Sequence, residues 1–315
     1  MKERNFARIQ KILKISLAAA IVLFLAVLCF FLPFYALLPA KNLPPREDGE
    51  LRLHLLSGVG DCKIVEFPSG NLLIVNAGDG SLNGRNEIYR YVKGLNPASV
   101  SLLATDADRS CVGAFLRILE SFSVERAYLP AFSKETGSYA KFVSALQERG
   151  VPAERITRYG AIADSSGAYA VCLSPYRTEE DATDASVVLW LNYGGVGIFL
   201  AGNTSSVRER RIYDEYLIDS TIFDTAEHRV RLDETDIYVA PSHGVRGGTR
   251  SELLKLLGAK EALIQCGRGY APSSETMTLL AQERLTVYRT DELNAVTVSV
   301  QNGAYRVISH FGEKR

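Results

Sequence analysis

The run Leu102-Leu103-Ala104-Thr105-Asp106-Ala107-Asp108-Arg109 lies between an apolar, strand-like stretch at 100–104 and a helical pattern at 114–119. A strand that leads through a short polar loop into a helix is the repeating unit of α/β layers. The loop carries two carboxylates, at Asp106 and Asp108, and no histidine. Whether this loop can hold a metal ion is therefore the first question that the sequence raises.

The rest of the chain extends this pattern in two blocks. Strand-like runs dominate residues 51–75 and strand–helix alternation follows to 149, and a second such block begins near 168. Strands are predicted at 51–56, 63–67, 72–75, 100–104, 126–129, 168–173, 186–191, 196–200, 221–223, 236–240, 262–266, near 287, 295–300 and 305–308, and helices at 86–95, 114–119, 139–149, 207–216, 251–257 and 274–283. Two such halves predict an α/β fold, a four-layer αββα sandwich. A generic α+β domain fits the same spacing.

An apolar segment precedes this domain. Residues 1–14 contain five basic side chains and one acidic one, and residues 15–40 contain no charge. A run of 26 residues is long enough to cross a hydrocarbon core of about 30 Å as a helix. We therefore predict a cytoplasmic basic tail at 1–14, a transmembrane signal anchor at 15–40, a stiff stalk at 41–50 and an extracytoplasmic domain at 51–315. The protein would then be a single-pass cell-membrane protein.

A cleaved signal peptide is the alternative, although its apolar region normally spans only about 7–15 residues. The small-residue exit near Ala40 has Leu38 where a small residue is needed.

The net charge of the chain bears on the partners that it could bind. Outside the tail, 31 basic and 35 acidic residues leave a net charge near −4, so strong nucleic-acid binding is not expected. The five cysteines are scattered without a C-x-x-C pair and form no disulfide framework.

Several runs resemble, in order, the metallo-β-lactamase-type domain of the ComEC-type DNA-uptake family. Residues 53–61, LHLLSGVGD, resemble the opening V-H-F-L-D-V-G-Q-G-D, and residues 67–78, FPSGNLLIVNAG, resemble F-P-N-G-K-x-x-L-I-D-A-G. Similar matches are SVVL through Tyr193-Gly194 to S-L-V-L-x-L-x-Y-G, FLAGN at 199–203 to F-L-L-T-G-D, APSHG at 240–244 to V-G-H-H-G, and VYRTD at 287–291 to the closing V-Y-R-T-D. The resemblance covers about residues 51–308 and implies the metallo-β-lactamase-like αββα sandwich.

The departures from the family pattern fall at its metal-ligand positions. Residues 102–109 correspond to the loop T-H-P-D-A-D-H, and this register gives a degenerate set of site positions: Ala104, Asp106, Asp108, Arg109, Asn203, Ser242, His243 and Ala271. A register shifted by one residue puts Thr105, Ala107, Arg109 and Ser110 at the ligand positions of the loop. Neither register leaves a histidine there. Asn203 replaces the bridging carboxylate of T-G-D, and Asn76 replaces the aspartate of L-I-D-A-G.

Counting imidazoles leads to the same expectation. A dinuclear zinc site of this type needs several neutral imidazoles, and the chain has four histidines, at 54, 228, 243 and 310. Only His243 stands where a ligand would. We therefore expect that the ancestral zinc site is lost and that the domain has no cofactor and no catalytic residue. Asp106 and Asp108 with Asp61 or Asp79 could still hold Mg²⁺ or Ca²⁺, which prefer oxygen ligands.

These observations favour a membrane-anchored, extracytoplasmic pseudoenzyme that acts as a binding or scaffolding module. Its expected partners are the membrane, through residues 15–40, and either a protein at the membrane or an anionic ligand held in the former cleft beside Arg246 and Arg268. The alternative function is a metal-dependent hydrolase, a nuclease or phosphodiesterase related to DNA uptake, with an atypical site. An exported binder of a small molecule is a third possibility.

Overall fold

The structure is a computed structural model, and it describes residues 13–27, 38–40, 43–132, 137–176, 185–267 and 271–309. Most of the predicted basic tail, residues 28–37 of the predicted anchor, Arg268 and His310 lie outside the described residues. Residues 13–27 of the predicted anchor are helical. Within the part of the chain that the structure describes, no helix is both long enough and apolar enough to cross a membrane.

The first sheet has eight strands, in the order β15-β14-β1-β2-β3-β4-β5-β6. Their bounds are β1 Leu51–Leu56, β2 Lys63–Glu66, β3 Leu72–Val75, β4 Val100–Leu103, β5 Val124–Leu129, β6 Ala153–Arg155, β14 Ala295–Gln301 and β15 Ala304–Ser309. The strands from β15 to β3 pair antiparallel, whereas those from β3 to β6 pair parallel. The last two strands in sequence thus lie beside the first one, with Leu53 opposite Val298.

The second sheet has seven strands, in the order β13-β12-β11-β10-β9-β8-β7. Their bounds are β7 Ala161–Ala163, β8 Tyr169–Ser174, β9 Val188–Tyr193, β10 Val196–Leu200, β11 Thr235–Val239, β12 Glu261–Ile264 and β13 Thr286–Arg289. Here the strands from β7 to β10 pair antiparallel and those from β10 to β13 pair parallel. Each sheet therefore has an antiparallel part and a parallel part.

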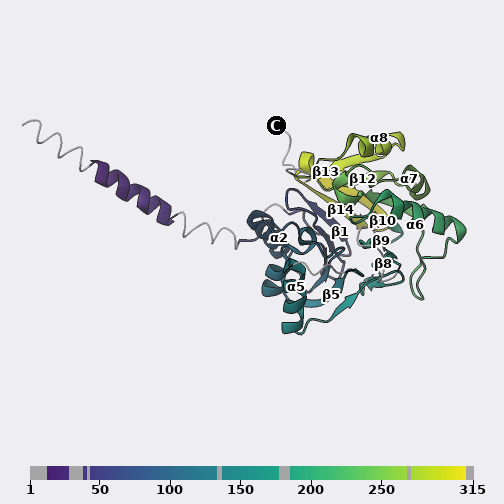
Figure 1. Ribbon diagram of the computed structural model, residues 1–315, viewed down its shortest axis with the longest axis horizontal. Coiled ribbons are helices and arrows are strands. Elements are labelled where there is room, and N and C mark those ends of the chain that lie inside the picture. The colour runs from purple at the N-terminus through teal and green to yellow at the C-terminus, as the bar shows by residue number, and fades with distance from the viewer. Residues whose placement is uncertain are drawn as a thin grey trace, which may run out of the picture.

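Helices cover the outer faces of both sheets, which makes four layers (Figure 1). The helices are α2 Leu82–Leu95, α3 Arg109–Val112, α4 Phe115–Ser121, α5 Gly137–Glu148, α6 Ser206–Ile218, α7 Ser251–Leu257, α8 Ser274–Gln282 and α9 Thr290–Leu293, with 3₁₀ turns η1 Leu232–Glu234 and η2 Pro241–Gly244. Three apolar cores separate the layers. One joins α2, α4 and α5 to the first sheet, one lies between the sheets, and one joins α6, α7 and α8 to the second sheet.

The alternation along β1 and β2 explains how the cores divide. Leu53 and Val65 face the core between the sheets, whereas Ile64 faces the core under the helices. Side chains of successive strand residues point to opposite faces, so a strand of an inner sheet must be buried on both. Burial of apolar surface in three separate cores is the main term that holds the layers together, at roughly 25 cal/mol for each Å² removed from water.

The predicted αββα sandwich is confirmed, and one predicted element is wrong. Residues 221–223, predicted as a strand, form a turn in which Thr221 N donates to Asp219 Oδ1 at 2.9 Å. The turn looks apolar in sequence because the Phe223 side chain is fully buried in the third core. The short strands β6 and β7 and the helix α3 were not predicted. These elements have three or four residues, which is too short for a periodic pattern.

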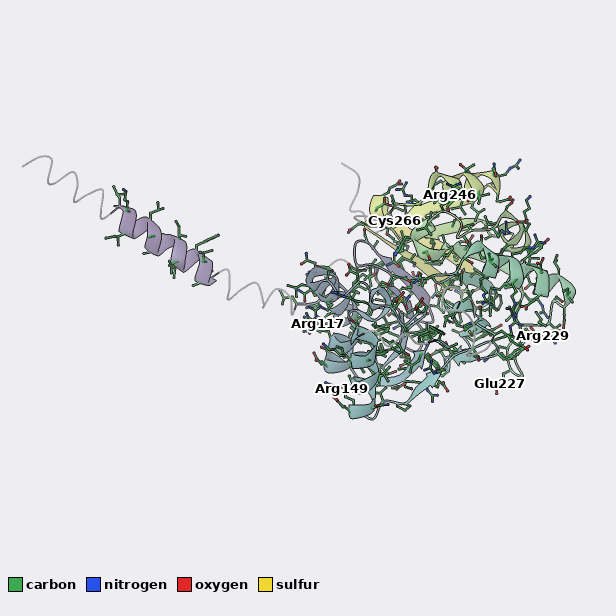
Figure 2. All side chains as sticks on the ribbon, viewed as in Figure 1. Arg117, Arg149, Glu227, Arg229, Arg246 and Cys266 are labelled. Atoms are coloured by element: carbon green, nitrogen blue, oxygen red, sulfur yellow. The ribbon has the colours of Figure 1, made fainter. Side chains whose placement is uncertain are left out.

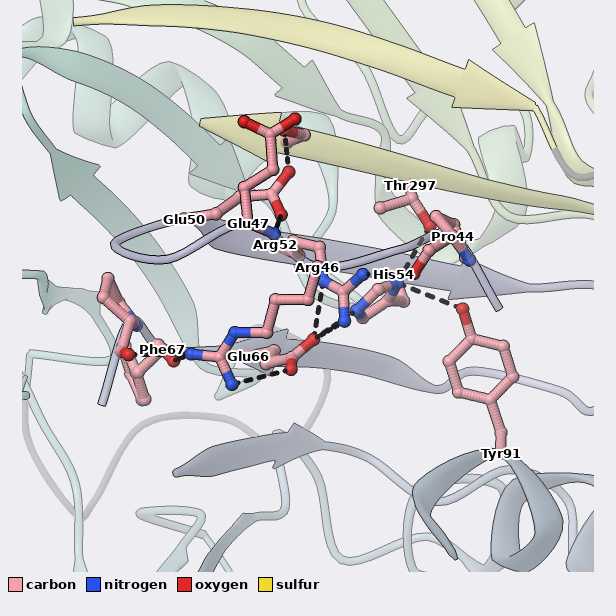
Figure 3. A network of polar contacts seen from close by, with 12 residues as sticks. Pro44, Arg46, Glu47, Glu50, Arg52, His54, Glu66, Phe67, Tyr91 and Thr297 are labelled. Carbon is pink, nitrogen blue, oxygen red and sulfur yellow. Dashed lines mark hydrogen bonds and ion pairs between the residues drawn. The ribbon is translucent and has the colours of Figure 1, made fainter. Parts of the chain in front are cut away.

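Residues 43–50, the described part of the predicted stalk, lie against the first sheet (Figure 3). Pro44 O accepts a hydrogen bond from Arg52 Nη1 at 2.7 Å, and Arg46 forms an ion pair with Glu66 at 3.1 Å. Glu50 accepts from Ser299 Oγ of β14, and the carboxylate of Glu50 is almost completely buried. The segment is therefore bound to β1, β2 and β14 by charged groups.

Beneath this segment lies a buried polar network centred on Glu66 (Figure 3). Its carboxylate Oε2 accepts from Arg52 Nε at 2.7 Å and lies 3.3 Å from His54 Nε2, and His54 Nδ1 lies 2.8 Å from Thr297 Oγ1. The Tyr91 hydroxyl from α2 is 3.0 Å from the same ring nitrogen. Burial lowers the pKa of His54, and the neighbouring Glu66 opposes this shift. His54 is thus a packed residue of the fold.

Candidate functional site

Loops of both halves that carry predicted site residues meet at one border of the sandwich. In the first sheet β3 and β4 end there, and in the second sheet β10, β11 and β12 do. Backbone contacts tie the two sides together. Val187 N donates to Thr105 O at 3.0 Å, and Gly58 N donates to Cys266 O at 3.4 Å. Loops that follow strand ends are the usual location of a binding site in layered α/β folds.

A buried polar cluster occupies this border on the side of the first sheet. Asn76 Nδ2 donates to Asp61 Oδ2 at 2.7 Å and to Thr105 Oγ1 at 2.8 Å, and Asn76 Oδ1 accepts from Thr105 N at 2.8 Å. Asn76 has φ 60°, a left-handed conformation that asparagine tolerates better than most residues. The Asn76 amide, which stands where the resembled pattern has an aspartate, is therefore fully used in hydrogen bonds within the protein.

Lys63, the first residue of β2, supplies the positive charge of this cluster. Its Nζ forms an ion pair with Asp61 Oδ1, and both side chains are 5% exposed. Burial raises the pKa of the Asp61 carboxyl, but the Lys63 ammonium and the nearby His243 outweigh burial, so the pKa of Asp61 is lowered. Asp61 is thus a carboxylate whose charge is balanced by a lysine inside the protein.

Cys111 of α3 connects the cluster to the second sheet. Its Sγ accepts a hydrogen bond from Asn203 Nδ2 at 3.6 Å, and the thiol is fully buried. Burial raises the pKa of Cys111, and the charges of Asp61 and Asp106 raise it further. The protonated thiol is therefore favoured at Cys111, and it is a poor nucleophile because the thiolate is the reactive form.

Asn203 follows β10 through a glycine that the backbone requires. Gly202 has φ +62°, and a Cβ there would lie 2.4 Å from Val187 O. The tight turn directs Asn203 N to Ser186 Oγ at 3.0 Å and brings the Asn203 side chain to Cys111. Asn203, which stands where the resembled sequence pattern has a carboxylate, thus places a neutral amide at this point of the site.

His243 lies in η2, where two consecutive residues have positive φ, 45° at Ser242 and 62° at His243. Ser242 N donates to Gly202 O at 3.0 Å. The His243 Nδ1 lies 2.8 Å from Gln265 O, which only accepts, so Nδ1 carries the proton and donates. Gln265 also accepts a hydrogen bond from Cys62 N, so His243 and the loop that carries Asp61 contact the same residue.

Gln265, which directly follows β12, is a site residue that the sequence did not reveal. Its Oε1 accepts from Cys62 N at 3.1 Å, and its Nε2 donates to Leu56 O at 2.9 Å and to Cys62 O at 2.8 Å. The residue is 3% exposed. One side chain of the second sheet thus fixes the loop between β1 and β2, which carries Asp61. A single glutamine in the apolar run 262–266 was the only available signal.

The other predicted positions do not join the cluster. Ala104 is completely buried in the core under the helices, whereas Asp108 and Arg109 are exposed at the start of α3. Ala271 is exposed, and Asp106 is half-buried. Asp79 Oδ1 accepts from Ser81 N at 2.8 Å before α2. Thr105, the first position of the shifted register, does face the cluster.

The donor set around Asp61 can be compared with the needs of a divalent metal. Among residues 13–27, 38–40, 43–132, 137–176, 185–267 and 271–309, no group of three or more His, Cys, Asp or Glu side chains is placed to hold a metal ion. The cluster presents one carboxylate paired with an ammonium, one imidazole, the amides of Asn76 and Asn203, a hydroxyl and a thiol. Zinc binds thiolates, neutral imidazoles and carboxylates. This donor set does not fit a dinuclear zinc centre.

Comparisons with known proteins show where this architecture occurs. No protein family model matches the chain. Over 206 residues the chain is 24% identical to ComE operon protein 3 of Bacillus subtilis (strain 168), which covers 64% of this chain and 25% of that protein. The chain therefore spans about a quarter of that relative's length.

Two solved structures resemble the fold. The CmlA beta-hydroxylase E377D mutant has a TM-score of 0.52 and 12% identity, covering 82% of this chain and 55% of that chain. Igni18, described as a novel metallo hydrolase from the hyperthermophilic archaeon Ignicoccus hospitalis KIN4/I, has a TM-score of 0.49 and 14% identity, covering 80% of this chain and 99% of that chain. At these identities the likeness to the CmlA enzyme concerns the fold alone.

Proposed function

Because the chain is a relative of ComE operon protein 3 with a metallo-β-lactamase-type fold, we propose that it is a membrane-anchored pseudoenzyme of the ComEC-type family. In this proposal the domain is a binding or scaffolding module that keeps the family's fold but no longer binds zinc for catalysis. Its partner would be a protein at the membrane. The predicted resemblance to this family is confirmed, whereas the loss of catalysis and the anchoring are proposals.

The ion pair between Lys63 and Asp61 carries the proposal. A buried carboxylate needs a countercharge, and Lys63 supplies one from within the chain. At an effective dielectric near 20, a like charge about 4 Å away costs on the order of 4 kcal/mol per unit charge pair. A divalent ion near Asp61 would have to overcome this repulsion from the Lys63 ammonium. The lysine thus favours a folded domain without metal.

The neighbouring groups support the same proposal. Zinc-dependent hydrolysis requires a metal that lowers the pKa of a bound water. Asn203 provides a neutral amide, Cys111 provides a protonated thiol, and His243 is a single imidazole. Of the two basic loop residues, Arg246 is described, and it forms an exposed ion pair with Glu275 at 2.7 Å. A protein partner at the membrane is therefore proposed before an anion held in the former cleft.

Anchoring is proposed from the N-terminal segment. Residues 15–40 contain no charge and follow five basic side chains, a pattern that favours a helix with a cytoplasmic N-terminus. The described residues 13–27 are helical, in agreement with the start of such an anchor. The chain would then be a single-pass protein of the cell membrane with its domain outside the cytoplasm.

The test is hydrolysis by the full chain purified in detergent micelles. With Zn²⁺ or Mn²⁺ supplied, we expect no turnover of single-stranded DNA, double-stranded DNA, RNA or a simple phosphodiester above the rate without protein. The His243→Ala variant is the matched control and should behave as the wild type does. Metal-dependent turnover that disappears in His243→Ala would mean that a working site exists, and the hydrolase alternative would replace the pseudoenzyme.

A further inference from the structure

The uncharged N-terminal run ends directly on helix α2. Ala40 N donates to Arg90 O at 2.8 Å, and Leu38 O accepts from Arg90 Nε at 3.1 Å. Ala40 and Leu43 pack against the core under the helices, and a Cβ on Gly94 would lie 2.6 Å from Leu43 Cδ1. The last residues of the run, 38–40, thus already belong to the surface of the domain.

Among the described residues, the end of the apolar run at 38–40 therefore contacts the domain directly. The segment 43–50, which the sequence suggested as a stalk, is bound to the first sheet through Arg46, Glu50 and Arg52. Residues 15–37 would span about 34 Å as a helix, since each residue adds about 1.5 Å. A bilayer core is about 30 Å thick. If this segment crosses the bilayer, α2 lies at the level of the lipid headgroups.

The outer face of α2 carries the basic and apolar side chains that suit contact with lipid headgroups. Residues 82, 85, 86, 89 and 93 share one face, because they recur every three or four residues. Leu82 is 65% exposed, and Arg85 and Lys93 are exposed as well. Tyr89 lies under two cations, with Lys93 Nζ 5.7 Å and the Arg117 guanidinium carbon 4.3 Å from its ring centre.

Charge on this face favours anionic lipid. The cations are Arg85, Lys93 and Arg117, and the exposed carboxylates nearby are Glu87, which pairs with Arg90 at 3.0 Å, and Glu120 on α4. Basic side chains next to a membrane segment are attracted to anionic headgroups. The Tyr89 ring is buried beneath these cations and packs on Phe122, with 5.8 Å between the ring centres.

We propose that the outer face of α2, formed by Leu82, Arg85 and Lys93 with Arg117 of α4, rests on the anionic headgroups of the membrane that holds the chain. This inference rests on the proposed anchoring, and it is independent of whether the domain hydrolyses anything. It fixes the orientation of the domain. The border with Asp61 and His243 then keeps one direction relative to the bilayer.

The experiment uses the full chain in nanodiscs, with Cys29→Ser to remove the cysteine of the apolar run. The described cysteines, at 62, 111, 172 and 266, are buried, so a fluorophore attaches to an introduced cysteine. One protein carries the label at Leu82→Cys and the control carries it at Glu227→Cys. Figure 2 shows Glu227 on the flank of the domain opposite to Arg117. The discs contain phosphatidylcholine alone or an equal mixture with phosphatidylglycerol.

In discs with phosphatidylglycerol we expect the emission of the label at 82 to shift to shorter wavelength and its quenching by acrylamide to fall. The label at 227 should not change. The charge reversals Arg85→Glu and Lys93→Glu together should abolish the effect, as should high salt, which screens exposed charges. The matched control is the pair Arg229→Glu and Lys255→Glu, which also reverses two exposed charges and should leave the effect in place.

Two results would overturn the proposal, and they differ. If the chain elutes with the discs but the label at 82 is as accessible as that at 227, the anchor holds and the contact of α2 is refuted. If the chain does not elute with the discs, the proposed anchoring fails, and the contact fails with it.

Discussion

The ammonium of Lys63 and the carboxylate of Asp61 form an ion pair that the folded protein shields from solvent, at the border where strands of both sheets end. Asp61 also accepts from Asn76, so the carboxylate is held by a cation and an amide of its own chain. The pair is therefore an integral part of the folded protein.

Replacement of Lys63 by methionine should strongly destabilise the fold. Removing one partner of a buried ion pair leaves an unbalanced charge and typically costs about 3–5 kcal/mol. The free energy of unfolding can be measured by urea denaturation of the full chain in micelles, through the fluorescence of Trp190, the only tryptophan. Lys63→Met combined with Asp61→Asn should recover most of the loss. A single variant as stable as the wild type would show that Asp61 is not charged there.

Replacement of Gln265 by methionine should cost about 3 kcal/mol, because it leaves the amide of Cys62 and two carbonyl oxygens buried without their partner. The matched control is Gln301→Met, whose single hydrogen bond to Asp48 O lies at the surface. That control should lose less than about 1 kcal/mol. Equal losses in the two variants would mean that the loop between β1 and β2 does not depend on Gln265.

Stability should fall as the pH rises from about 5 to about 8, because of Glu209. Burial raises the pKa of this carboxyl from 4.5 to about 8, against hydrogen bonds from Tyr238 and Arg250 N that lower it. In this range the folded protein keeps a proton that the unfolded chain releases, so the stabilisation present at low pH is lost as the pH passes 8. The total is on the order of 4 kcal/mol.

The variant Glu209→Gln cannot release a proton and should remove most of this slope. Urea denaturation at several pH values would measure it, with the exposed Glu227→Gln as the control that keeps the slope. If Glu209→Gln and the wild type have the same pH dependence, another group is responsible.

Replacement of Glu66 by glutamine should loosen the segment 43–50. The variant weakens the ion pairs with Arg46 and Arg52, and hydrogen bonds to charged groups contribute about 1.5–3 kcal/mol each. Trypsin cleavage after Arg46 should therefore become at least about tenfold faster, since about 1.4 kcal/mol corresponds to a factor of ten. Cleavage is measured while Trp190 fluorescence reports a folded domain.

The control for this experiment is Glu154→Gln, which weakens an exposed ion pair with Arg126 at 3.1 Å. It should leave the cleavage rate unchanged, because exposed pairs contribute little. Cleavage after Arg46 that is equally slow in all three proteins would show that Glu66 does not hold the segment.

A metal chelator should leave the thermal unfolding of the full chain unchanged. Structural metal sites couple binding directly to folding, so their removal lowers the melting temperature by many degrees. The donor set at Asp61, Asn203 and His243 gives no reason for such a site. A large drop with chelator that zinc reverses would contradict the proposed loss of metal.

The fold could be predicted from the sequence because its signals are local and ordered. Helix α7 and strand β10 have the predicted bounds, since each has clear periodicity and a turn residue at its edge. Short elements such as β7, with three residues, depend on pairing with β8 and have no signal of their own. The turn at 221–223 was mistaken because burial of Phe223 resembles a strand in sequence.

The site was less accessible to prediction. The motif order identified Asn203 and His243, which the structure does bring to one border, and it also identified Asp108 and Arg109, which point to solvent. Cys111 and Gln265 give no hint of their partners in the sequence, because those partners lie about 90 to 200 positions away, as in the contacts of Cys111 with Asn203 and of Gln265 with Cys62. Lys63 pairs with Asp61 only two positions away, but the sequence gives no sign that both side chains are buried.

The pairing of β1 with β14 has a consequence for how the protein is made. Leu51 stands opposite Val300, so the first strand of the domain finds its neighbour only after nearly 250 further residues have been synthesised. Contacts so distant in sequence slow folding, because a long loop must close before they form. During translation the first sheet therefore has an unpaired edge at β1 until β14 is made. A chaperone or a nearby surface would have to cover that edge so that other strands do not pair with it.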